Sequence, residues 1–139
     1  MKTKHYLTLS DAEVLLERAQ QAANEMGLNV SISVVDETGS LLTMKRLDGA
    51  SPLTASFSLE KAKGSAISRL PSKSLEDMIK NGQIGILNMS SFSGSLEGGE
   101  PILYQGNLIG AVGVSGAQSF QDAEIARSAI DAFLAHVTQ

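Results

Sequence analysis

The fold is decided by residues 98–116, which read GGEPILYQGNLIGAVGVSG. Asn107 follows Gly106 between two apolar runs, and this arrangement predicts a β-hairpin that turns at these two residues. The second run also carries glycine at every third position, at Gly110, Gly113 and Gly116. Because glycine weakens a strand, its repetition indicates that another backbone or a ligand approaches closely. We therefore expect a glycine-rich loop followed by the hairpin that closes a sheet.

Periodic apolar residues predict further helices and strands on both sides of this hairpin. Before it come a helix over residues 10–26, with Ser10 and Glu13 as a capping box, and strands over residues 30–35 and 41–47. There follow helices over residues 53–68 and 72–81, a short strand over residues 85–88 and a loop over residues 90–99. A last helix begins at Ser119. This order predicts an α/β (α+β) fold with a mainly antiparallel sheet covered by helices.

Composition limits the class of protein. The chain has 139 residues, 42% apolar and 19% charged, which predicts one globular domain over residues 1–139. Its net charge of −4 argues against a general nucleic-acid-binding protein. The absence of cysteine excludes disulfides, thiolate metal sites and cysteine nucleophiles. No run approaches the roughly 20 apolar residues of a membrane span, so we expect a cytoplasmic protein without membrane contact.

The charge is unevenly distributed along the chain. Residues 45–80 carry a net charge of +3, which leaves −7 for the rest. The basic residues there are Lys45, Arg46, Lys61, Lys63, Arg69, Lys73 and Lys80, against Asp48, Glu60, Glu76 and Asp77. This segment predicts either an anionic small ligand nearby or a solvated helix face.

Arg46 is the strongest single candidate for ligand binding. It ends a predicted strand at the Asp48-Gly49 turn, and its planar guanidinium suits a carboxylate. The alternative is a structural ion pair with Asp48 or Glu100. Lys61, on the following helix, adds a second positive charge to the same region.

Two carboxylates and two histidines are the remaining candidates for chemistry. Glu97 and Glu100 flank the double glycine, where they serve as a general base or metal ligands, or only solvate the loop. His5 and His136 lie near opposite ends of the chain and form no local metal motif. We expect a surface or subunit-contact role for His136. Ser115 lies in no nucleophile elbow, because Ala117 stands where that motif needs glycine.

Several short segments together resemble the GlcG/HbpS family of haem-binding-like proteins, which also occurs as the C-terminal domain of PduO-type proteins. The resemblance covers nearly the whole chain. The segments, in order, are Ser33-Val34-Val35-Asp36 with Gly39 and Leu41, Arg46 with Asp48-Gly49-Ala50, Lys61-Ala62, Gly98-Gly99 with Pro101-Ile102, Gly110-Ala111-Val112-Gly113-Val114-Ser115-Gly116, and Gln121-Asp122 with Ile125-Ala126. The resemblance implies a profilin-like three-layer α/β/α sandwich with an antiparallel five-stranded sheet. It also implies a homo-oligomer, with haem or a corrinoid as the ligand in some members.

Family members that bind haem iron through histidine tend to carry it in the first helix, whereas residues 10–26 contain none. An axial ligand here has to be His5, a methionine such as Met26 or Met44, Tyr104, or a group from another subunit.

Three functions remain open at this point. The first is a small-molecule-binding accessory protein for haem, a corrinoid or a small organic acid. Its ligand-binding residues are Arg46, Asp48, Gly49, Lys61, Gly98, Gly99 and Ser115, where glycine N–H groups and the two cations hold an anionic group. The second is an enzyme on a carbonyl or carboxylate metabolite, with Arg46 orienting the substrate and Glu97 or Glu100 moving a proton. The third is a purely structural oligomer.

Overall fold

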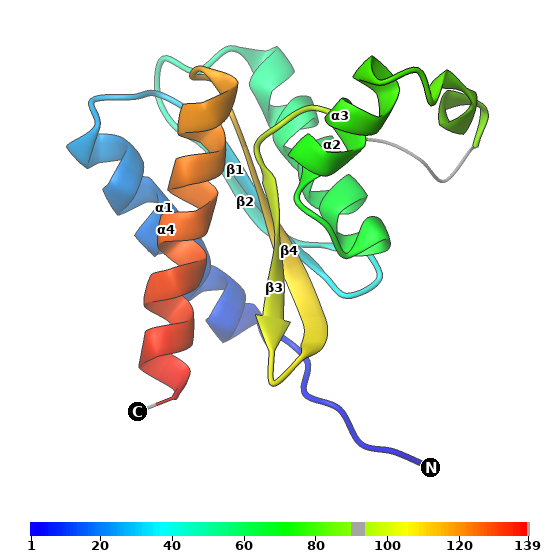
Figure 1. Cartoon of the computed structure of the whole chain (residues 1–139). Helices are drawn as coiled ribbons and strands as arrows, with labels where there is room; N and C mark the ends of the chain where they lie inside the picture. Colours follow the sequence, from blue (N-terminus) through cyan, green and yellow to red (C-terminus); the bar gives the residue numbers. More distant parts are fainter. Residues whose placement is uncertain (90–93, 139) are drawn as a thin grey trace.

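The computed structural model describes residues 1–89 and 94–138. They form four α-helices, one 3₁₀ helix and four strands. In chain order these are α1 (Leu9–Glu25), β1 (Ser31–Asp36), β2 (Leu41–Arg46), α2 (Pro52–Ser68), α3 (Ser72–Lys80), η1 (Ile84–Asn88), β3 (Gly99–Tyr104), β4 (Asn107–Ser115) and α4 (Ser119–Val137). The strands form one antiparallel sheet in the order β2-β1-β4-β3. α1 and α4 lie side by side on one face of the sheet, and α2 and α3 lie on the other (Figure 1). The predicted α/β/α sandwich is therefore confirmed.

The two faces of the sheet differ in the size of their side chains. Ile32, Val34, Val112 and Val114 face α1 and α4 and belong to the main apolar core. Alternate residues of the same strands face α2, where Val35 and Ala111 pack against Ala62 and Ala66. Large side chains thus fill the α1–α4 side, while small ones let α2 approach the sheet closely.

Gly113 shows how close this approach is. A Cβ atom at Gly113 would lie 2.0 Å from the Ser58 carbonyl oxygen and 2.6 Å from the Ala62 nitrogen, both in α2. Beside it, the buried hydroxyls of Ser33 and Ser58 form a 2.8 Å hydrogen bond. The repeated glycines therefore serve helix packing at this position, one of the two readings that the sequence allowed.

The described residues form four strands, not the five implied by the family resemblance, because residues 84–88 form η1, which buries no residue. A fifth strand at residues 85–88 would have to pair with the free edge of β3, and the backbone groups at this edge do not favour such pairing. The Gly98 carbonyl accepts from Val114 N at 3.0 Å, so the next N–H group, that of Gly99, points away from β4. The Ser72 hydroxyl accepts that N–H at 2.8 Å. Two residues on, Pro101 has no N–H to offer.

The capping of α1 and the turn of the hairpin differ slightly from the predictions, whereas the start of α4 does not. Thr8 caps α1, because its hydroxyl accepts from Asp11 N at 3.1 Å while the Asp11 carboxylate accepts from Thr8 N at 2.9 Å. The capping box thus lies two residues before the predicted one. α4 begins at Ser119 as predicted, with Gln118 as its N-cap. The hairpin is confirmed, but its turn lies one residue earlier, where Gln105 and Gly106 both have positive φ.

Candidate functional site

Four of the predicted ligand-binding residues lie together where β4 ends. Gly98 is joined to β4 by its bond to Val114 N, and Gly99 begins β3. Lys61, from the middle of α2, donates from Nζ to the Val114 carbonyl at 3.0 Å. Ser115 is the next residue of β4. The fold therefore brings Lys61, Gly98, Gly99 and Ser115 into one region at this end of the sheet.

The Lys61 ammonium is buried there and already paired. Its Nζ lies 3.1 Å from Asp122 Oδ2, and the two side chains are only 5% and 2% exposed. Asp122 Oδ1 also accepts from Ala117 N at 3.0 Å. Burial raises the pKa of Asp122 despite the opposing effects of Lys61 and the backbone N–H groups. Lys61 therefore neutralises Asp122 and joins α2 to the start of α4.

The double glycine packs on this lysine. A Cβ atom at Gly98, where φ is +136°, would lie 2.9 Å from Lys61 Nζ and 2.6 Å from the Val114 carbonyl oxygen. A Cβ atom at Gly99 would lie 2.1 Å from the Lys61 carbonyl oxygen. The Gly99 N–H, which the sequence suggested as a donor to a ligand, is already bound by Ser72. Both glycines are thus explained by close packing around Lys61.

Arg46 lies at the same end of the sheet, two strands away. It is opposite Ser31 in the β1–β2 ladder, and Ser31 is opposite Ser115 in the β1–β4 ladder. Directly opposed residues project to the same face. The Ser31 hydroxyl meets the Thr54 hydroxyl of α2 at 2.8 Å, so this row of side chains faces α2. Arg46 is exposed and forms no ion pair with the described residues, so neither predicted structural pair, with Asp48 or with Glu100, is present.

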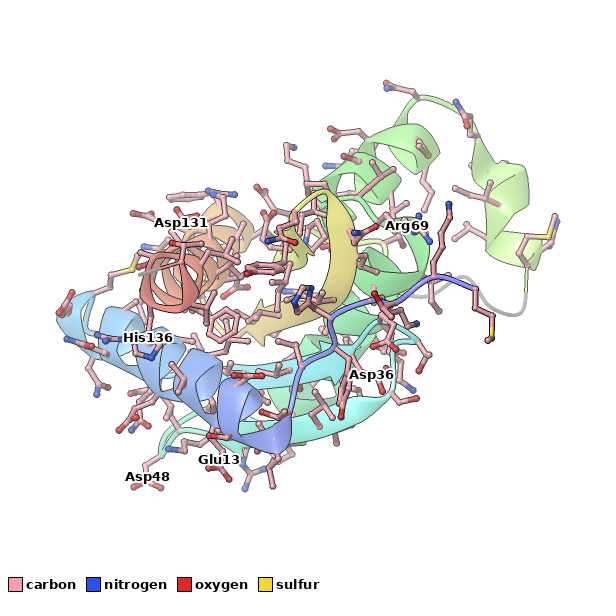
Figure 2. All side chains as sticks on the ribbon, turned by 90° about the horizontal axis from the view of Figure 1, so that it is seen from below. Glu13, Asp36, Asp48, Arg69, Asp131 and His136 are labelled. Atoms are coloured by element: carbon pink, nitrogen blue, oxygen red, sulfur yellow. The ribbon has the colours of Figure 1, made fainter. Side chains whose placement is uncertain are left out.

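Asp48 and Gly49, two further predicted ligand-binding residues, lie in the turn that follows Arg46. Asp48 is exposed and points away from the body of the protein (Figure 2). Gly49 has φ +90°, and a Cβ atom there would lie 2.8 Å from the Asn29 side-chain nitrogen. Gly49 is therefore required by the turn and by its contact with Asn29.

Glu100 lies on the opposite face of the sheet from Arg46. Its Oε1 accepts from Arg127 Nη1 of α4 at 2.9 Å, and the residue is 7% exposed. Burial raises the pKa of Glu100, and this effect outweighs that of Arg127. Glu97 is half-buried, and its backbone N–H donates to the Glu76 carboxylate at 3.2 Å. The structure thus does not bring Arg46 and Glu100 into one site.

His5 lines a small apolar cavity at the other end of the sheet. Its ring packs edge-on against Tyr104, with centroids 5.0 Å apart and planes at 76°. The cavity has a volume of about 140 Å³, and it is lined by His5, Tyr6, Leu7, Asp11, Tyr104, Ile109, Phe133 and Val137. Leu7 is buried next to Gly110, where a Cβ atom would lie 2.5 Å from the leucine. Two of the four side chains considered as haem ligands, His5 and Tyr104, therefore meet in one place.

His136 lies between α1 and α4 (Figure 2), in a separate open groove of about 710 Å³. The other lining residues all come from α1 and are mostly polar: Val14, Glu17, Arg18, Gln20, Gln21, Asn24 and Glu25. The two histidines of the chain thus lie in two different hollows, one apolar and one polar.

Sequence reasoning missed Asp122 and Arg127. In the sequence, Asp122 appears only in the Gln121-Asp122 segment of the family resemblance, and its pairing with Lys61 joins residues 61 positions apart. Arg127 was not considered, although it neutralises Glu100. No sequence signal identifies such pairs, because the partners meet only through the tertiary fold.

Two broader features bear on function. Over residues 1–89 and 94–138, no group of three or more His, Cys, Asp or Glu side chains is placed to hold a metal ion. Within the same ranges, no helix combines the length and apolar character needed to cross a membrane.

Comparison with known proteins gives a consistent result. The family described as haem-degrading protein HbpS-like matches residues 7–131. The chain is similar to Protein GlcG of Escherichia coli K12, with 40% identity over 115 residues, which cover 83% of this chain and 85% of that protein.

Two solved structures have the same fold. The crystal structure of Klebsiella pneumoniae protein ORFY has a TM-score of 0.88 at 28% identity and covers 96% of this chain and 94% of that chain. The crystal structure of a PduOC–haem complex has a TM-score of 0.82 at 26% identity and covers 92% of this chain and 95% of that chain.

Proposed function

The chain belongs to the HbpS-like family of haem-degrading proteins, and on this premise we propose that it binds haem as an accessory protein, with His5 as the ligand of the iron. The family description and the haem in the PduOC complex support a haem-type ligand. The observation that carries the proposal for this chain is the meeting of His5 and Tyr104 at an apolar cavity.

The chemistry of the cavity fits haem. An imidazole is a common axial ligand of haem iron, and a phenol is another. The cavity walls contributed by Leu7, Ile109 and Phe133 suit the apolar edge of a porphyrin. The exposed His5 ring is accessible to a ligand, and it makes an edge-on contact with Tyr104.

The volume of the cavity predicts that a second surface takes part. Sites that enclose a ligand of this kind measure roughly 300–1,000 Å³, which is at least about twice the volume of this cavity. Tyr6, one of the residues that line it, is 68% exposed. We propose that a second copy of the chain covers the macrocycle at this end of the sheet, which agrees with the homo-oligomer that the family resemblance implies.

The enzyme alternative receives less support. In that alternative, Arg46 orients a carbonyl or carboxylate metabolite while Glu97 or Glu100 moves a proton, so these residues have to meet at one site. Glu100 is instead paired with Arg127 of α4, on the opposite face of the sheet from Arg46. We therefore propose binding rather than turnover, and expect the bound spectrum to persist when a reductant such as ascorbate is added in air.

A haem titration followed by Soret absorbance tests the proposal. We expect a saturable, shifted band with the wild-type protein, loss of that shift in His5→Ala, and retention in His136→Ala. These two variants form a matched pair, because they remove the only two histidines from two different hollows. Light scattering with and without haem measures assembly in the same samples.

Two outcomes would contradict the proposal. A band that never saturates, like that of free haem, would exclude specific binding. Loss of the shift in His136→Ala with retention in His5→Ala would move the site to the groove between α1 and α4.

A further inference from the structure

We infer that the end of the sheet opposite His5 carries a second, independent site for a small monocarboxylate, formed by Arg46, Ser115 and the first turn of α2. β4 runs over nine residues from Asn107 to Ser115, so its two ends lie about 25 Å apart. The inference therefore does not depend on haem binding, and either can fail alone.

The first observation is the common row that these side chains share. Arg46, Ser31 and Ser115 are opposed in register across β2, β1 and β4, and the bond between the Ser31 and Thr54 hydroxyls shows that the row faces α2. Neighbouring strands are spaced by about 4.8 Å, so the Arg46 and Ser115 Cα atoms lie about 10 Å apart. An extended arginine side chain bridges most of that distance.

The second observation is a hydroxyl without a partner. Ser115 is 5% exposed, yet its hydroxyl makes no hydrogen bond with the described residues. Every fully enclosed side-chain nitrogen or oxygen in the described part of the chain has a partner. Ser115 lies in the row of side chains that faces α2, so its hydroxyl is available as a hydrogen-bond donor on that side of the sheet.

The third observation concerns the positive end of α2. Ser51 is the N-cap residue, but its side chain makes no capping bond, and the first turn contains no acidic residue. Thr54 N donates to the Ser51 carbonyl at 3.1 Å and Pro52 has no N–H, which leaves the Leu53 N–H for an external acceptor. The helix dipole favours a negative charge at this position.

The charges around the site select a single carboxylate. The Arg46 guanidinium forms no ion pair with the described residues, whereas the Lys61 charge is neutralised by Asp122. Lys45 is directed to the other face, where its Nζ donates to Gln20 of α1 at 2.7 Å. One unpaired cation, a hydroxyl and a backbone N–H thus fit a monoanion rather than phosphate.

An NMR titration with sodium propionate tests the inference. We expect saturable amide shifts at Leu53 and Ser115, beyond those produced by sodium chloride at the same ionic strength. Arg46→Gln should weaken binding about 10-fold or more, because a hydrogen-bonded charge pair is removed. Ser115→Ala should weaken it about tenfold. Lys45→Gln is the control, because it removes a neighbouring charge from the opposite face and should leave the affinity unchanged.

Three results would overturn the inference: equal shifts with sodium chloride, an unchanged affinity in Arg46→Gln, or tighter binding of inorganic phosphate than of propionate. Arg46 is exposed, so its variant is expected to fold, and the amide spectrum of the free variant verifies this. The haem titration of Arg46→Gln should match that of the wild type, which separates this site from the proposed haem site.

Discussion

Replacing Lys61 by methionine is expected to reduce the free energy of unfolding by about 3–5 kcal/mol. Methionine keeps an unbranched apolar stem like that of lysine but leaves Asp122 as a buried, uncompensated charge. It also removes the donor to the Val114 carbonyl. The free energy of unfolding of a small domain is about 5–15 kcal/mol, so this loss is a large fraction of the total stability.

A double variant tests whether the unpaired charge of Asp122 causes the loss of stability in Lys61→Met. Asp122→Asn removes the charge but keeps an oxygen that accepts from Ala117 N. Lys61→Met combined with Asp122→Asn should therefore be more stable than the sum of the single losses predicts, by about 1–3 kcal/mol. Acidification provides a second test: burial already raises the pKa of Asp122, and removal of Lys61 raises it further. A raised folded-state pKa means that protonation favours the folded state, so the deficit of Lys61→Met should shrink as pH falls through that pKa.

Urea denaturation followed by far-UV circular dichroism measures these differences, since the chain has no tryptophan for fluorescence. The slope of free energy against urea should stay constant, so that the change appears in the midpoint. A loss below about 1 kcal/mol in Lys61→Met, or single losses that add within about 0.5 kcal/mol, would refute the reasoning.

Two further predictions concern the packing of α2 and the buried carboxylate of β3. Gly113→Ala should lower the free energy of unfolding by more than about 3 kcal/mol in the same urea assay, because its Cβ atom would lie 2.0 Å from the Ser58 carbonyl oxygen. Gly85→Ala is the control, because a Cβ atom there meets open space and should change the stability little. Similar urea midpoints for the two variants would contradict this account of the packing. Glu100→Gln removes a carboxyl whose pKa is raised by burial against the effect of Arg127. The stability of the wild type relative to this variant should therefore rise as pH falls from 7 through the folded-state pKa, and a thermal-melting series that shows the opposite trend would exclude it.

The local elements could be predicted closely because their signals lie within a few residues. Apolar periodicity located the helices, and the glycine next to Asn107 located the hairpin to within one residue. The segment at residues 85–88 was read as a strand and forms η1 instead. A run of four residues does not specify its own conformation, and the edge of β3 that would pair with it is closed by Ser72 and Pro101.

The candidate site could be predicted only in part. Arg46 and Ser115 were identified at strand ends, and register brings them to one end and one face of the sheet. Lys61 was read as a free cation because its charge is visible in the sequence, whereas its partner is not.

The sequence by itself determined where the chain turns, which segments are helical and which strand contains repeated glycines, since these properties depend on residues that are close along the chain. Only the tertiary structure decided that Lys61 is neutralised by Asp122, that Glu100 and Arg46 lie on opposite faces, and that His5 meets Tyr104. The physical reason is that a charge or a ring acts on whatever lies within a few ångströms in space, and for these residues that neighbour is far away along the chain.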